Sequence, residues 1–184
     1  METQEPSAPI PRPARRGTKI VLVFIMGLIV AMWVYAFGFA PRESINRIGD
    51  QQWSARAERR CAAAEARRFE MQDLSPMDPD DSGALRRKAG IVERATDDLE
   101  AVIDEIEGDR PTDAKGRAIV PDWIADYRVY ISDRRLFVDR LRSLPTRPNF
   151  NETDVGGVPV SERINKFARE NDMKSCQTPY DLSV

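Results

Sequence analysis

The sequence of 184 residues contains no histidine and only two cysteines, Cys61 and Cys176. Histidine is the usual base that activates a serine or cysteine nucleophile, so its absence removes the common nucleophilic triads. A structural zinc site needs four cysteine or histidine ligands, and the chain also lacks the ligands for haem or an iron–sulfur cluster. We therefore expect no catalytic residues, no metal and no cofactor, and we do not expect an enzyme.

Several other signals are missing. There is no glycine-rich phosphate loop, no nucleophile motif and no repeat of solenoid period, and alternating strand patterns are scarce. The formal net charge is −2, and because the first 19 residues carry +2, the rest of the chain carries −4. An acidic domain has no electrostatic attraction to nucleic acid, so we expect no nucleic-acid partner.

One apolar run interrupts a sequence in which 32% of the residues are charged. Between Lys19 and Arg42 no side chain is ionisable except a tyrosine. About 20 apolar residues cross a hydrocarbon core of ~30 Å as a helix, and residues 20–40 have that length. The run is longer than the ~7–15 residues of a signal-peptide core, so we predict an uncleaved transmembrane helix at residues 19–41. Aromatic residues typical of a membrane interface gather in its second half: Trp33, Tyr35, Phe37 and Phe39.

The flanks of this run predict its orientation. Four basic residues precede it, which favours a cytoplasmic N-terminus: Arg12, Arg15, Arg16 and Lys19. Residues 1–18 contain four prolines and few apolar groups, so we expect a disordered cytoplasmic tail. Residues 42–184 would form an extracytoplasmic helical domain of a single-pass cell-membrane protein. Gly27 and Ala31 are spaced as in helices that pair in membranes, so self-association through the span is one expectation.

The two cysteines favour a disulfide. Their even number, their wide separation and their position beyond the expected anchor are typical of a bond formed in an oxidising compartment. Closing a loop of about 100 residues stabilises a domain by ~4.7 kcal/mol, less any native strain. The alternative is two inert buried thiols.

Hydrophobic periodicity predicts four helices after the span, at about residues 50–71, 83–107, 121–144 and 160–170. Pro121 suits the first turn of the third helix, and residues 108–120 read as a loop. The first helix has an inward stripe of Trp53, Ala57, Cys61, Ala64 and Phe69. The fold class expected is all-α: one transmembrane helix followed by a small helical bundle closed by a disulfide.

The second and third helices each carry an apolar seam with alternating steps of four and three. The second helix has the seam Leu85, Ala89, Val92, Thr96, Leu99, Ile103 and Ile106. The third helix has the seam Trp123, Tyr127, Tyr130, Arg134, Phe137, Leu141 and Leu144. Each seam has a polar residue at its fourth position. An antiparallel hairpin of the two helices would bring Thr96 and Arg134 together near its middle.

Two groups of side chains are candidates for chemistry. Trp123, Tyr127, Tyr130 and Arg134 share one helical face, where Arg134 could receive a carboxylate or phosphate. The alternative is a set of core aromatics with a structurally paired arginine. A second group of carboxylates between residues 97 and 107 falls mainly opposite the apolar seam, which favours a solvated surface over acid–base catalysis.

The segments Trp53 to Cys61 and Ile164 to Cys176 carry a resemblance. A tryptophan- and cysteine-bearing helix after an anchor, and a late helix "INKFARENDMKSC" with a second cysteine, resemble a group of uncharacterised single-pass envelope proteins of actinobacteria. The resemblance covers the two ends of the domain and implies an envelope location.

The function expected is a non-enzymatic single-pass membrane protein whose acidic extracytoplasmic domain contacts another envelope protein. The alternative is an extracytoplasmic domain that binds or senses a small ligand on the face from Trp123 to Arg134.

Overall fold

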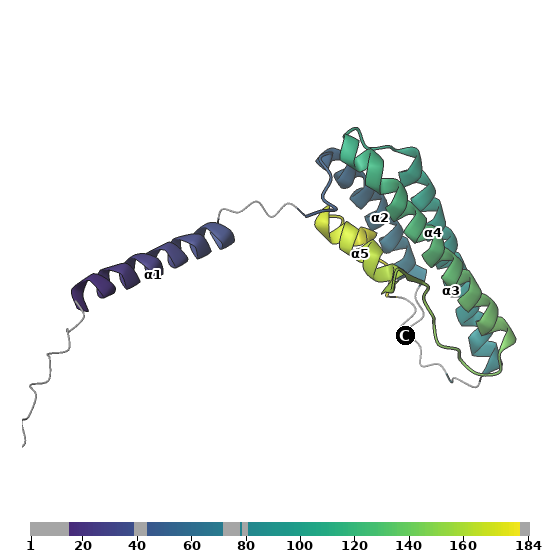
Figure 1. Ribbon diagram of the computed structural model, residues 1–184. Coiled ribbons are helices and arrows are strands. Elements are labelled where there is room, and N and C mark those ends of the chain that lie inside the picture. Colours follow the sequence, from purple (N-terminus) through teal and green to yellow (C-terminus); the bar gives the residue numbers. More distant parts are fainter. Residues whose placement is uncertain (1–14, 39–43, 72–77, 79–80, 181–184) are drawn as a thin grey trace, which may run out of the picture. The chain divides into compact units, whose positions relative to one another are not determined.

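The computed structural model describes residues 15–38, 44–71, 78 and 81–180 (Figure 1). The chain divides between Glu43 and Ser44 into two compact units. In the described residues the first unit holds one helix, and the second holds four α-helices, a short 3₁₀ turn and a two-stranded hairpin.

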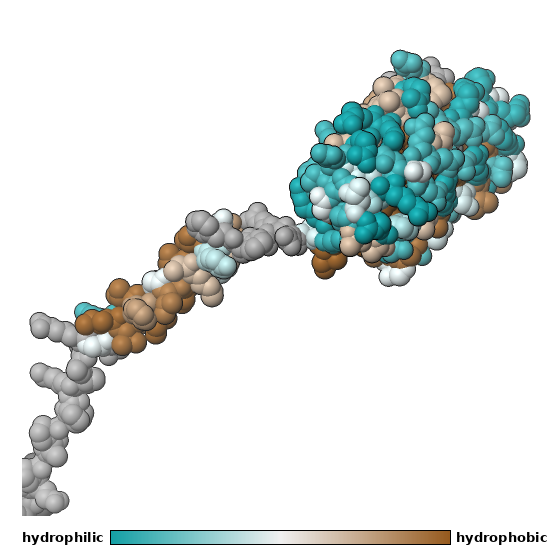
Figure 2. Space-filling model, turned by 90° about the horizontal axis from the view of Figure 1, so that it is seen from above, coloured by the Kyte–Doolittle hydropathy of each residue, from teal (hydrophilic) through white to brown (hydrophobic). Residues whose placement is uncertain are grey.

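Helix α1 (Arg15–Gly38) contains the apolar run. From Lys19 to Gly38 it is long and apolar enough to cross a membrane, by length and composition, and none of this segment is buried against the rest of the chain. Figure 2 shows its mostly apolar surface, whereas the visible face of the second unit is mostly hydrophilic. The helix includes residues 15–18, the last four residues of the segment expected to be disordered. Residues 1–14 and 39–41 of the expected segments lie outside the described residues.

The second unit is a helical bundle, as the periodicity predicts (Figure 1). Three long helices pack together and α5 lies against α4, while the 3₁₀ turn η1 lies against α2. The helices are α2 (Gln51–Met71), α3 (Ser82–Gly108), α4 (Ala114–Ser143) and α5 (Val160–Glu170), followed by η1 (Lys174–Cys176). The prediction for α5 matches both of its ends, and those for α2 and α3 match within one residue.

The segment between α4 and α5 is more ordered than an irregular linker. Strands β1 (Asp154–Val155) and β2 (Val158–Pro159) pair as an antiparallel hairpin. Its turn residues, Gly156 and Gly157, have φ of 64° and 80°, a conformation that glycine adopts without steric cost.

The start of α4 corrects the prediction at Pro121. The helix begins seven residues earlier, at Ala114, and Pro121 lies inside it. A proline in a helix interior removes one N–H···O bond and usually kinks or ends the helix. Here the first two turns have other support, because the Asp113 carboxylate accepts from the N–H of Gly116 (2.8 Å) as an N-cap. Residues 114–120 are therefore helical rather than part of a loop.

The buried apolar side chains form two clusters. The main core draws on α2, α3, α4, α5 and η1 and contains an aromatic group in which the Trp123 ring stacks on Phe167 (5.1 Å between centroids) and meets Trp53 edge-on (6.4 Å). The hairpin core lies between α3 and α4 and, among the described residues, consists of Leu85, Ala89, Val92, Phe137, Val138 and Leu141. Phe150, from the segment after α4, packs against both cores.

The seam residues of α3 are all buried, as predicted, and so are those of α4 except Leu144, which is 42% exposed. Leu144 follows the last helical residue, so it has left the helical register. In α2 the stripe from Trp53 to Ala64 is buried, but Phe69 is 63% exposed and Arg68 is buried in its place. A further step of four leads from Ala64 to position 68, so the prediction of Phe69 was wrong by one residue.

Candidate functional site

The two cysteines form a disulfide, as predicted, with 5.1 Å between their Cα atoms. The bond joins the middle of α2 to η1, and both residues are buried in the main core. Around it, the Ser175 N–H donates to the Glu58 carboxylate (2.9 Å), and the Tyr127 hydroxyl donates to the Cys176 carbonyl (2.6 Å). Burial raises the pKa of the Tyr127 phenol, so it stays protonated and keeps this bond.

The four residues of the predicted ligand face lie inside the bundle. None of them is more than 2% exposed: Trp123, Tyr127, Tyr130 and Arg134. The Trp123 indole N–H donates to the Ile164 carbonyl (3.3 Å), and the Tyr130 hydroxyl lies 3.5 Å from the Pro179 carbonyl. Trp123 also borders an open groove between α4 and α5. The polar atoms of its three aromatic side chains thus contact α5 and the segment after it.

Thr96 and Arg134 meet between the two helices, as the paired seams predict. The Arg134 Nε–H donates to the Thr96 hydroxyl oxygen (2.9 Å), which in turn donates to the Val92 carbonyl (2.6 Å). The Arg134 guanidinium also lies 5.8 Å from the centroid of the Tyr130 ring. Along both helices this polar pair lies between the residues of the main core and those of the hairpin core.

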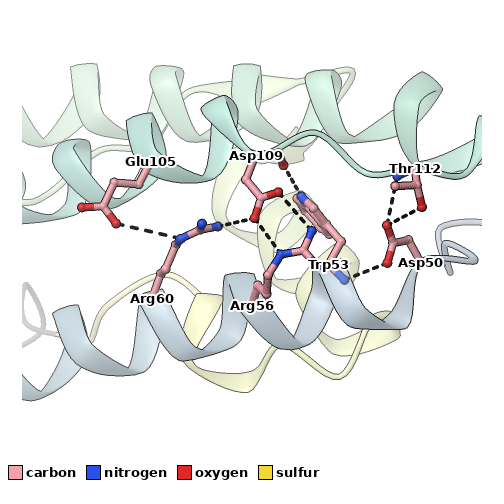
Figure 3. Close-up of polar contacts among 7 residues, drawn as sticks. All are labelled: Asp50, Trp53, Arg56, Arg60, Glu105, Asp109 and Thr112. Atoms are coloured by element: carbon pink, nitrogen blue, oxygen red, sulfur yellow. Dashed lines mark hydrogen bonds and ion pairs between the residues drawn. The ribbon is translucent and has the colours of Figure 1, made fainter.

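A second polar cluster lies at the end of the bundle that contains residues 44–50, which we call the tethered end because the chain joins it to α1. Asp109, just after α3, is its centre (Figure 3). Its carboxylate accepts from Arg56 Nε (2.9 Å) and Arg60 Nη1 (2.7 Å), and its carbonyl accepts from the Trp53 indole N–H. The Arg56 hydrogen bonds, with those of Arg60, lower the pKa of Asp109 to about 2.

Asp50 joins the start of α2 to Thr112 in the turn between α3 and α4. Its carboxylate accepts from the Trp53 N–H (2.8 Å), where it acts in the first turn of α2, and from the Thr112 N–H (3.0 Å) and hydroxyl (2.7 Å) (Figure 3). The backbone N–H groups of Thr112 and Trp53 stabilise the ionised form and lower the pKa of Asp50 to about 2.

Asp113 completes the cluster. Besides capping α4, its carboxylate accepts from the N–H groups of Gly49 and Asp50, both at 3.1 Å. Partial burial alone would raise its pKa, but the N–H donors of Gly116, Gly49 and Asp50 outweigh this and lower it. The three aspartates therefore fix the turn between α3 and α4 to the start of α2.

An open cavity of about 290 Å³ lies beside this turn, between the end of α3 and the first half of α4. Its lining is mostly apolar: Ile106, Pro111, Val120, Pro121 and Ile124. Its charged lining residues are Glu107, Asp109, Arg110 and Arg117. Sequence reasoning missed this site because it treated residues 108–120 as a loop. The aspartates and threonine of "GDRPTD" were the available signal, since such residues often cap helices and turns.

The carboxylates of α3 lie at the surface, as expected, and several of them also pair with arginines of both neighbouring helices. Arg128 of α4 contacts Asp104 (2.5 Å) and Glu107 (2.6 Å), and Arg67 of α2 contacts Asp98 (2.7 Å). Exposed pairs of this kind each contribute ~0–1 kcal/mol, but together they favour one register of α3 between α2 and α4.

Comparison of this chain with protein-family models, with curated proteins and with solved structures finds no match.

Proposed function

We propose that this chain is a non-enzymatic single-pass membrane protein whose helical domain lies outside the cytoplasm and acts by binding another envelope component. The observation that carries the proposal is the contrast between α1 and the bundle. From Lys19 to Gly38, α1 buries none of its apolar surface against the chain, whereas the bundle has cores of its own. A bilayer offers α1 the apolar surroundings that the chain does not supply.

The disulfide supports the location of the domain. Structural disulfides persist in oxidising compartments and are rare in the cytosol. A bond between Cys61 and Cys176, inside the main core, fits a domain that folds after translocation. The basic residues before the apolar run favour the same orientation, with the N-terminus inside. The resemblance to actinobacterial envelope proteins agrees with this proposed location.

We propose binding rather than catalysis as the activity. The side chains of the polar clusters described above are engaged in contacts that hold the helices together. Asp50, Asp109 and Asp113 receive backbone and arginine donors, and Arg134 contacts Thr96 between the cores. The face from Trp123 to Arg134 is buried, so we do not carry small-ligand binding there forward as the function.

Thiol mapping on intact cells and isolated membranes tests this proposal. Cells expressing the full chain are treated with a membrane-impermeant maleimide, with and without prior reduction, and the membranes are analysed by mass spectrometry. We expect a Cys61–Cys176 linked peptide without reduction, and labelling from outside only after reduction. A full chain found in the soluble fraction, or two free thiols in unreduced membranes, would contradict the proposal.

A further inference from the structure

The cavity at the tethered end is lined by two carboxylates and two arginines. Two carboxylates line it, and both are already paired: Glu107 contacts Arg128 at 2.6 Å, and Asp109 contacts Arg60 at 2.7 Å. The two other charged lining residues are Arg110 and Arg117. Within the part of the chain that the structure describes, neither makes an ion pair. The cavity therefore presents positive charge on a domain that is acidic as a whole.

A third cation lies at the tethered end, outside the lining of the cavity. Lys115 lies in the first turn of α4, and its ammonium donates to the Ser44 carbonyl (3.3 Å), a neutral acceptor. Arg117 likewise donates to the carbonyl of Thr112. Neither acceptor is a carboxylate. All three cations are exposed: Arg110, Lys115 and Arg117.

The chemistry of the cavity suits an anionic amphiphile. Arginine and lysine side chains bind phosphate oxygens through charge-assisted hydrogen bonds. The lining beside them is apolar, with Pro111, Val120 and Pro121 among its residues, and would accept glycerol and upper acyl-chain carbons. A phospholipid has both parts next to each other: an anionic phosphate for the cations, and glycerol and upper acyl-chain carbons for the apolar lining.

The chain itself brings such lipids within reach. Six peptide steps lead from Gly38, the end of α1, to Ser44, and they span at most about 22 Å. We propose that the tethered end docks on the anionic phospholipids of the bilayer that holds α1, with headgroup phosphates on Arg110, Lys115 and Arg117. This inference rests on the proposed function, and such docking would orient the bundle for its partner.

Hydrogen exchange of the full chain in nanodiscs tests the inference. The chain is reconstituted in discs of phosphatidylcholine alone and in discs that also contain phosphatidylglycerol, and exchange is followed by mass spectrometry. We expect the amides of residues 108–117 to exchange more slowly in the anionic discs, by up to about tenfold, because three cations gain favourable contacts there. High salt should remove the difference through screening.

Two triple variants separate docking from folding. Arg110→Glu, Lys115→Glu and Arg117→Glu together should abolish the lipid-dependent protection. The matched control replaces three cations toward the other end of the bundle, which also make no ion pair with described residues: Arg86→Glu, Arg94→Glu and Arg140→Glu. This control should keep the protection. Should the first variant misfold, the salt series on the unaltered chain gives the answer.

The outcomes distinguish the two proposals. Equal exchange of residues 108–117 in both kinds of disc, with the chain inserted, overturns lipid docking and leaves the membrane anchor standing; this end would then be free for a protein. Protection that survives high salt or the first triple variant also overturns it. A chain that does not insert into either disc overturns both the docking and the proposed function.

Discussion

The main core and the hairpin core differ in how much of the chain encloses them. The main core is covered by α2, α3, α4 and α5 and is crossed by the disulfide, whereas the hairpin core lies between α3 and α4 with Phe150 packed against it. The Arg134–Thr96 pair lies between them. The disulfide and most of the buried polar contacts thus lie in or beside the main core, and we expect the far end of the α3–α4 hairpin to open first.

Removing the disulfide should have the largest effect on this contrast. Cys61→Ala together with Cys176→Ala releases a loop with a sequence separation of 115 and should lower the free energy of unfolding by about 4 kcal/mol. Urea denaturation of the full chain in detergent measures the loss, and reduction of the unaltered protein is the matched control. If hydrogen exchange shows that only the hairpin core loses protection in the double variant, the disulfide does not act in the main core, contrary to our expectation.

A cavity in the hairpin core should cost slightly less. Leu141→Ala removes a buried side chain of the hairpin core, and it should lower the free energy of unfolding by about 3 kcal/mol. Hydrogen exchange should show faster opening near residues 85–92 and 137–141, with the main core nearly unchanged. If both cores open together, the bundle behaves as one cooperative unit, which would contradict the expectation that the hairpin core opens first.

The boundary between the cores can be tested by a double-mutant cycle. Arg134→Met removes a fully buried donor and should lower the free energy of unfolding by about 2 kcal/mol, because the Thr96 hydroxyl oxygen then accepts no hydrogen bond from Arg134. Thr96→Val combined with Arg134→Met should cost less than the sum of the two single variants. Strict additivity would show that the contact contributes nothing. A stable Arg134→Met protein that loses binding of a small ligand would instead restore the ligand-face interpretation.

Acid should weaken the tethered end, where the carboxylates with the lowest pKa values lie. The pKa values of Asp50 and Asp109 are about 2 in the folded protein, below the ordinary value of 3.8. A depressed folded pKa stabilises the protein above pH 4, and that contribution is lost as the pH falls from about 4 through 2. Thermal unfolding from pH 5 to pH 2 should show a falling midpoint. Asp109→Asn should flatten this fall, while Asp139→Asn, an exposed carboxylate near the hairpin core, should not.

The smallest effect is expected for the exposed ion pairs along the hairpin. Arg142→Ala removes a pair with Glu93 in which both side chains are about two-fifths exposed, so the expected loss is under about 1 kcal/mol. Chemical denaturation measures this loss against the unaltered protein. A loss as large as that of Leu141→Ala would show that such pairs, and not apolar packing, hold the hairpin together.

Much of the bundle could be predicted from local pattern. The seams of α3 and α4 predict their own burial and even the meeting of Thr96 with Arg134, because the helical period fixes which residues share a face. The disulfide followed from counting cysteines. Burial of Arg68 in place of Phe69 could also have been found by continuing the same steps along α2.

Other features depend on partners far away in the sequence. Pro121 marks a helix start by local rules, but Asp113, held by Gly49 and Asp50, supports two earlier turns. No periodicity encodes a contact across 64 positions. The basic cavity was hidden for the same reason, since its positive charge is apparent only once Glu107 and Asp109 are seen to be paired with arginines of other helices.

The disulfide also determines how the domain bears mechanical load. When α1 is held and the chain is pulled at a point beyond Cys176, tension enters along α2 and crosses at Cys61 directly to η1. The residues between the two cysteines, with α3, α4 and α5 among them, lie outside this covalent path and are not extended. Stretching the intact protein can then extend only the segments before Cys61 and after Cys176, and reduction would add the length of the enclosed loop.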